Sequence, residues 1–190
     1  MRNAEGKMER GWPHIRPNSV LVAAMSNHWK GNSWAKVMDM IEVTNKAEIY
    51  CAFSEIQDRC FDPYDALGTM RNEAIMQALN EGFDFLLYID NDIQPEPDTL
   101  LRLLKWQMPV VSPYVVEPGT GTKLFGPGSL EPNSGLQQAK WAVLSMVLFD
   151  TKVFKITGPT FWEDAIGADE GFHYQKLWYY VHRLSIATGP

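Results

Sequence analysis

The chain has 190 residues, 45% of them hydrophobic and 21% charged, with a formal net charge of -6 at pH 7. This length fits one globular domain with a sizeable core. The acidic balance argues against nucleic acid as the main partner, because nucleic-acid affinity draws mostly on Lys and Arg side chains that neutralise phosphates. The apolar stretches are too short to cross a bilayer and show no leader pattern, so we expect a soluble, cytoplasmic protein without a transmembrane segment.

The first part of the chain predicts an arm and then a strand and a helix. Residues 1–17 are polar and without periodicity, so we expect a flexible N-terminal arm ahead of a single domain at 18–190. The continuous apolar run at 20–25 is typical of a strand covered on both faces. Asn32 or Ser33 can then cap a helix with an apolar face. That face consists of Trp34, Val37, Met38 and Ile41.

Two more strands and two more helices alternate along the next part of the chain. Residues 47–54 alternate apolar and polar side chains and predict a second strand. The helix that follows has one apolar face, and Gly82 suits the position just past its end. Residues 83–89 form the most apolar strand candidate, a Pro-Asp pair at 97–98 begins another helix, and Val110 begins a short strand. The apolar face of the helix before Gly82 consists of Met70, Ala74, Ile75, Ala78 and Leu79.

The last third of the chain is less regular. Residues 117–138 are dense in Gly, Pro, Ser and Asn, which predicts a long mobile loop that could act as a lid. Strand character returns at 141–149, a short helix is expected at 151–156, and an aromatic helix within 167–183. Residues 185–188 suggest a last edge strand.

This alternation of strands and helices favours an α/β domain. We expect a Rossmann-like, mainly parallel sheet flanked by helices, with a small antiparallel C-terminal portion. Ligands of such sheets bind beyond the carboxyl ends of the strands.

Two carboxylates, Asp90 and Asp92, follow directly after the apolar strand at 83–89. Both can reach one cation, since the chain is free to turn where a strand ends. Hard oxygen ligands suit Mg²⁺ or Mn²⁺, which also bind phosphate oxygens, and an acidic chain needs such a metal to hold a small anionic ligand. The structural alternative is a turn in which both side chains cap backbone amides.

Several motifs, taken in order, resemble the GT-A fold glycosyltransferases, especially the family 2-like group, over roughly residues 19–188. Two motifs depart from that group. Ala168 stands where the group usually has Glu, and the strand at 141–149 lacks the glycines common there. The motifs that carry the resemblance are Arg71-Asn72-Glu73-Ala74, Tyr88-Ile89-Asp90-Asn91-Asp92, Pro97-Asp98-Thr99-Leu100-Leu101, the strand at 142–149 followed by Asp150-Thr151-Lys152-Val153-Phe154, and Gly167-Ala168-Asp169-Glu170-Gly171-Phe172.

The resemblance implies a metal-dependent, hexosyltransferase-like enzyme that uses a nucleoside-diphosphate sugar as donor. Mn²⁺ or Mg²⁺ would neutralise the diphosphate as it leaves. Asp90 would lie toward the ribose, Asp92 on the metal, and Asn91 between them in the donor site. Arg71 would contact nucleotide or phosphate, although a helix-surface Arg is more often solvated or ion-paired. His28, just beyond the first strand, could meet the nucleotide base, and its alternative is an exposed loop position.

The acceptor half of the site would come from the C-terminal part of the chain. Asp169 would be the general base that deprotonates an unidentified acceptor hydroxyl for an in-line, inverting attack on the anomeric carbon. Its alternative role is to cap a helix, and Glu170 is the second candidate base. His173 lies one helical turn after Asp169, and some GT-A enzymes take a third metal ligand from a C-terminal His; packing within the helix is the alternative.

Two other functions remain open at this point. One is a non-catalytic nucleotide- or sugar-binding module of the same fold, since Ala168 replaces an expected acid. The other is a metal-dependent nucleotidyltransferase, which also uses paired aspartates but would normally need a Gly-rich, Lys- or Arg-bearing loop after the first strand. Residues 26–31 supply one Lys and one Gly.

Overall fold

The computed structural model describes residues 19–25, 29–57, 63–115, 137–138, 145–157 and 186–189. The arm expected at 1–17, most of the loop expected at 117–138 and the helix expected within 167–183 lie outside these ranges. In chain order the elements are β1 (Val20–Met25), α1 (Ser33–Lys46), β2 (Cys51–Ile56), α2 (Pro63–Glu81), β3 (Phe85–Asp90), α3 (Thr99–Lys105), β4 (Val110–Pro113), β5 (Gln137–Gln138), β6 (Met146–Asp150), α4 (Lys152–Thr157) and β7 (Ile186–Gly189).

The strands form one seven-stranded sheet in the order β2-β1-β3-β6-β4-β7-β5. β1 pairs in parallel with β2 and β3, and β4 pairs in parallel with β7. β6 runs antiparallel to both β3 and β4, and β5 runs antiparallel to β7. Most strands therefore share one direction, and the two that run against it, β5 and β6, come from the C-terminal half of the chain. The expected α/β class with a mainly parallel sheet is confirmed.

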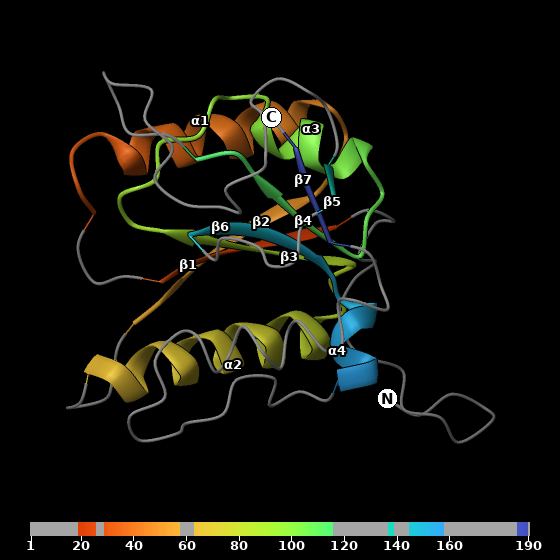
Figure 1. Ribbon diagram of the computed structural model, residues 1–190. Coiled ribbons are helices and arrows are strands. Elements are labelled where there is room, and N and C mark those ends of the chain that lie inside the picture. Colours follow the sequence, from red (N-terminus) through yellow and green to blue (C-terminus); the bar gives the residue numbers. More distant parts are fainter. Residues whose placement is uncertain are drawn as a thin grey trace, which may run out of the picture.

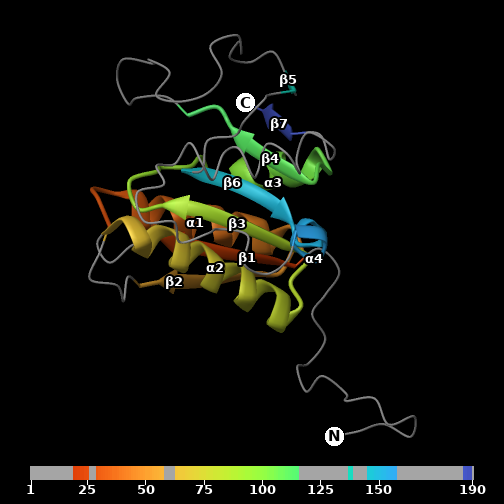
Figure 2. The same cartoon turned by 60° about the horizontal axis from the view of Figure 1, so that its bottom comes forward.

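Helices cover both faces of this sheet. Figures 1 and 2 show α2 on one face and α1 with α3 on the other. The β1 side chains divide accordingly: Leu21, Ala23 and Met25 join the apolar cluster on the α2 side, while Val20 and Val22 join the cluster under α1 and α3. All six residues of β1 are buried, which explains the continuous apolar run in the sequence. Among the helices described, none combines the length and the apolar character needed to cross a membrane.

Three sequence expectations need correction. The second strand begins at Cys51 rather than at residue 47, because Ala47 still donates to carbonyls of α1 and Glu48 takes a left-handed conformation (φ 63°) after the helix. Trp34 does not face the core and is 43% exposed. The strand expected at 185–188 is present as β7, but it lies between β4 and β5 instead of at the edge.

Residues typical of helix boundaries stand at the start of α1 and at both ends of α2. Asn32 occupies the N-cap of α1, although its side chain makes no capping hydrogen bond. Helix α2 starts at Pro63, whose fixed φ and missing N–H suit the first helical turn. It ends at Glu81, and the following Gly82 has a φ of 76°, which confirms the predicted helix end.

Candidate functional site

The candidate site lies at the end of the sheet where the parallel strands β1, β2 and β3 have their carboxyl ends. Parallel pairing places the last residue of β1, Met25, opposite Ile56 of β2 and Asp90 of β3. The antiparallel strand β6 begins at this same edge, and Ser145, just before it, accepts a hydrogen bond of 2.8 Å from the Asp90 N–H. The carboxylate motif therefore emerges between β1 and β6, beyond the carboxyl end of an inner strand, as the α/β rule for ligand sites requires.

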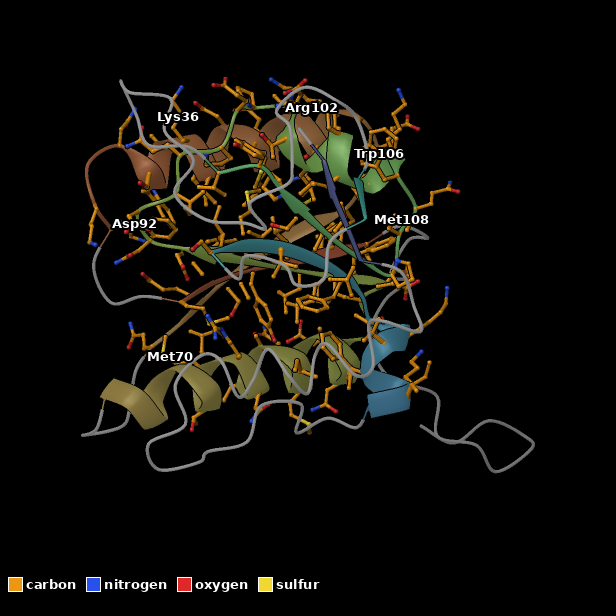
Figure 3. All side chains as sticks on the ribbon, viewed as in Figure 1. Lys36, Met70, Asp92, Arg102, Trp106 and Met108 are labelled. Atoms are coloured by element: carbon orange, nitrogen blue, oxygen red, sulfur yellow. The ribbon has the colours of Figure 1, made fainter. Side chains whose placement is uncertain are left out.

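Asp90 and Asp92 lie on the two sides of a tight turn. The Ile93 N–H donates to the Asp90 carbonyl at 3.2 Å, which closes the turn directly after β3. Tyr88 belongs to the apolar cluster on the α2 side, so strand alternation places Asp90 on that side as well. Asp90 is partly buried, whereas the side chain of Asp92 is 49% exposed. Figure 3 shows Asp92 at the end of the molecule opposite Trp106 and Met108.

The loop after β1 contacts this turn through Lys30. The Lys30 N–H donates to the Asn91 carbonyl at 3.1 Å, and the Lys30 Nζ lies 3.2 Å from Oδ2 of Asp92. Backbone and side chain of one residue thus contact both members of an Asn-Asp pair that is about sixty positions away in the sequence. A positive charge stands beside the more exposed carboxylate.

Three aromatic rings pack together where residues 29–34 meet β2: Trp29, Trp34 of α1 and Phe53 of β2. The ring centroids of Trp29 and Trp34 are 5.3 Å apart, and those of Trp34 and Phe53 are 5.0 Å apart, both in edge-to-face geometry. The indole Nε1–H of Trp29 also donates to Glu55 Oε1 at 3.1 Å. Residues 29–34 therefore contact β2 on one side and the Asp90-Asp92 turn on the other.

Arg71 is buried in α2 with only 3% of its surface exposed, which excludes the solvated helix-surface position, one of the two alternatives to a nucleotide contact. Its backbone carbonyl accepts a hydrogen bond of 2.8 Å from the Tyr88 hydroxyl. Since Tyr88 and Asp90 point to the same face of β3, the structure brings Arg71 and Asp90 into the same layer between sheet and helix. Of the residues expected in the donor site, this layer and the adjoining turn hold Arg71, Asp90, Asn91 and Asp92.

The remaining candidates, His28, Asp169, Glu170 and His173, lie outside the described ranges and stay predictions. Trp29 was not singled out from the sequence, and Lys30 was considered only as the one Lys among residues 26–31. A signal was present, because both come a few residues after the expected first strand, and segments that follow parallel strands lie at the ligand-binding end of the sheet.

The side chains of Asp90 and Asp92 suit a hard divalent cation that also binds a ligand. Two carboxylates provide oxygen ligands of the type that Mg²⁺ and Mn²⁺ prefer. Within the part of the chain that the structure describes, no group of three or more His, Cys, Asp or Glu residues could hold a metal ion alone. Such a cation would have to complete its coordination with water and with oxygens of a bound ligand.

The fold is similar to that of two solved structures. A glycosyltransferase involved in the glycosylation of the major capsid of PBCV-1 superposes with a TM-score of 0.51 and 11% identity, over 90% of this chain and 82% of that one. A197 from STIV superposes with a TM-score of 0.50 and 11% identity, over 90% of this chain and 81% of that one. No family model and no curated protein sequence matches the chain. At 11% identity these likenesses show only that the chain shares the overall fold of the two proteins.

Proposed function

We propose that the protein is a metal-dependent transferase that moves a sugar from a nucleoside diphosphate to an acceptor hydroxyl. One observation carries the proposal: Asp90 and Asp92 leave an inner strand at the ligand edge of a glycosyltransferase-like sheet, with the Lys30 ammonium 3.2 Å from Asp92. Paired carboxylates with a neighbouring cationic side chain suit a metal-bound diphosphate, in which negative oxygens need more than one positive partner.

Three of the described residues would have different roles in binding the sugar donor. Asp92, the more exposed carboxylate, would hold Mn²⁺ or Mg²⁺, which supplies neutralisation of the diphosphate when bound. Asp90, partly buried on the α2 side, would contact the ribose. Arg71 lies in the same layer and, as a permanently charged side chain, would add a positive charge toward the nucleotide.

The acceptor side of the proposal rests on the sequence resemblance. Asp169 would take the proton from the acceptor hydroxyl, whose oxygen bonds to the anomeric carbon. The bond from that carbon to the diphosphate oxygen breaks, and the electron pair leaves with the nucleoside diphosphate. An in-line attack of this kind inverts the anomeric configuration, and Glu170 is the second candidate for the base.

A nucleotidyltransferase is the second candidate function, because Lys30 provides a lysine on the loop after β1 that touches the carboxylate turn. The two reactions differ in products. Sugar transfer or donor hydrolysis releases a nucleoside diphosphate, whereas nucleotidyl transfer releases pyrophosphate from a nucleoside triphosphate.

The test is a product assay with a panel of UDP-, GDP- and TDP-sugars and with nucleoside triphosphates plus sugar phosphates, each with Mn²⁺ or with EDTA. We expect nucleoside diphosphate release that needs the metal and falls by about 100-fold or more in Asp92→Asn, the size seen when one charge-stabilising group is removed from an active site. Asp98→Asn is the matched control, because Asp98 also forms an exposed ion pair, with Arg102 at 3.3 Å. Pyrophosphate release would select the second candidate, and turnover that survives Asp92→Asn and EDTA would refute the proposal.

A further inference from the structure

The ion pair between Lys30 and Asp92 joins two loops at the candidate donor site. Its side chains are 69% and 49% exposed, respectively. Exposed ion pairs of this kind change an equilibrium constant by about fivefold at most. The pair therefore contributes little to folding, and the ammonium group can exchange Asp92 for another anionic partner at small cost.

The backbone of Lys30, in contrast, is held firmly. Its N–H donates to the Asn91 carbonyl at 3.1 Å, and its carbonyl accepts the Ser33 N–H at 3.2 Å. The next residue, Gly31, adopts a φ of 56°, which a residue with a side chain rarely takes. On the other side, Trp29 is anchored to Glu55 and packed against Trp34. A fixed backbone with a weakly held side-chain charge is the arrangement expected of a group that changes partner when a ligand arrives.

The electrostatics of the turn point to the same conclusion. In the free protein, the Lys30 ammonium supplies positive charge to Asp92. A divalent cation on that carboxylate would compete with the ammonium for the same oxygens. A divalent cation does not fully neutralise an ionised diphosphate, so a further positive charge next to the metal is complementary to the complex.

We propose that Lys30 is a ligand-switched residue: it pairs with Asp92 in the free protein, gives way to the divalent cation, and then contacts the diphosphate of the bound nucleotide. The inference rests on the proposed function, since it assigns the partner of one residue in the same site. It predicts that loss of the Lys30 charge weakens binding of the nucleotide and does not weaken binding of the metal. Loss of the charge removes a competitor of the metal and removes a partner of the diphosphate.

The experiment compares wild type, Lys30→Met and Lys46→Met by isothermal titration calorimetry. Lys46 is the matched control, because its side chain is 72% exposed and also pairs with a carboxylate, Glu42, at the other end of α1. With UDP or GDP in the presence of Mn²⁺, we expect Lys30→Met to bind about tenfold more weakly, the loss of one charge-assisted hydrogen bond. With Mn²⁺ alone, we expect Lys30→Met to bind as tightly as wild type or up to about fivefold more tightly. Lys46→Met should match wild type in both titrations.

The outcomes separate the inference from the proposed function. If wild type binds the nucleotide with Mn²⁺ and Lys30→Met binds it equally well, the inference is overturned and the function stands. Weaker binding of Mn²⁺ alone by Lys30→Met would also overturn the inference, since a competitor cannot strengthen binding. If wild type binds no nucleotide with Mn²⁺, both the function and the inference fail. Circular dichroism and the thermal midpoint, which should be unchanged in an exposed Lys→Met variant, exclude unfolding as the cause.

Discussion

The hydroxyl of Tyr88 donates a hydrogen bond of 2.8 Å to the backbone carbonyl of Arg71, and both residues are buried. This bond ties β3 to α2 two residues before Asp90, the first carboxylate of the candidate site. The bond also fixes the depth at which Arg71 enters the layer between helix and sheet. The geometry of the candidate site thus depends on a contact within the core.

Tyr88→Phe removes this hydroxyl and keeps the ring. We expect the free energy of unfolding to fall by about 1 kcal/mol, the usual net worth of one buried hydrogen bond. Tyr50→Phe is the control, because Tyr50 is 47% exposed and its ring stacks on Phe83 irrespective of its hydroxyl. Urea denaturation of both variants measures the difference. Equal stability of the two variants would show that the Tyr88 hydroxyl contributes nothing.

Ser33→Ala is expected to stabilise the protein. The Ser33 hydroxyl oxygen is buried and finds no hydrogen-bond partner among the residues that the structure describes. Replacing it with Ala removes an unsatisfied polar group and improves helix propensity, so the free energy of unfolding should rise by about 0.5–1 kcal/mol. Ser54→Ala should have the opposite effect, because the Ser54 hydroxyl donates to Gln77 Oε1 at 2.8 Å. A loss of stability in Ser33→Ala under the same urea titration would mean that this hydroxyl is hydrogen-bonded in solution.

Thr151→Val tests the hydrogen bonds between the segment just before β3 and the residue just before α4. The buried Thr151 hydroxyl lies 2.8 Å from the Phe83 carbonyl and 3.0 Å from the Asp84 carbonyl, both just before β3. Its removal should cost about 1–2 kcal/mol of unfolding free energy, since a buried carbonyl loses its donor. Thr44→Val should cost less, because the Thr44 hydroxyl only bonds back to Met40 within α1. Thermal or urea unfolding measures the loss of unfolding free energy in both variants. Equal losses in Thr151→Val and Thr44→Val would contradict this ranking.

Cys51 should react slowly in the folded protein. Burial raises the pKa of its thiol from 9.0 to about 12, so the reactive thiolate is scarce below that pH. The stability that comes from keeping this thiol neutral is fully present below pH 9, where the unfolded chain is protonated too, and is lost as the pH rises toward 12. Peptide mapping after iodoacetamide treatment should show Cys51 alkylated rapidly in guanidinium chloride and only slowly without it. Similar rates in both conditions would contradict the buried position.

Local patterns in the sequence predicted those parts of the fold that local chemistry determines. The apolar run of β1 and the end of α2 at Gly82 followed from burial and from backbone preference. The Asp90-Asp92 pair could be placed at a strand end because hydrophobicity stops there. The start of β2 could not be predicted, because the left-handed conformation of Glu48 leaves no signature in the residue pattern.

Contacts between segments that are distant in the sequence could not be predicted from the residue pattern. Helical spacing placed Trp34 in the core, whereas the structure packs it against Trp29 and Phe53 at the exposed rim. The pairing of Lys30 with Asp92 depends on how two loops meet across the sheet edge, which no local periodicity encodes. The depth of Arg71 likewise follows from the packing of a whole helix on the sheet.

The most direct test of the account is calorimetry of UDP and GDP binding, with Mn²⁺ and with EDTA, on wild type and Asp92→Asn, with Asp98→Asn as control. We expect binding by wild type only when Mn²⁺ is present, binding by Asp98→Asn equal to wild type, and binding by Asp92→Asn weaker by about 100-fold, or ~2.7 kcal/mol. Nucleotide binding that needs no metal, or that is as tight in Asp92→Asn as in wild type, would contradict a metal-bound diphosphate at the end of β3.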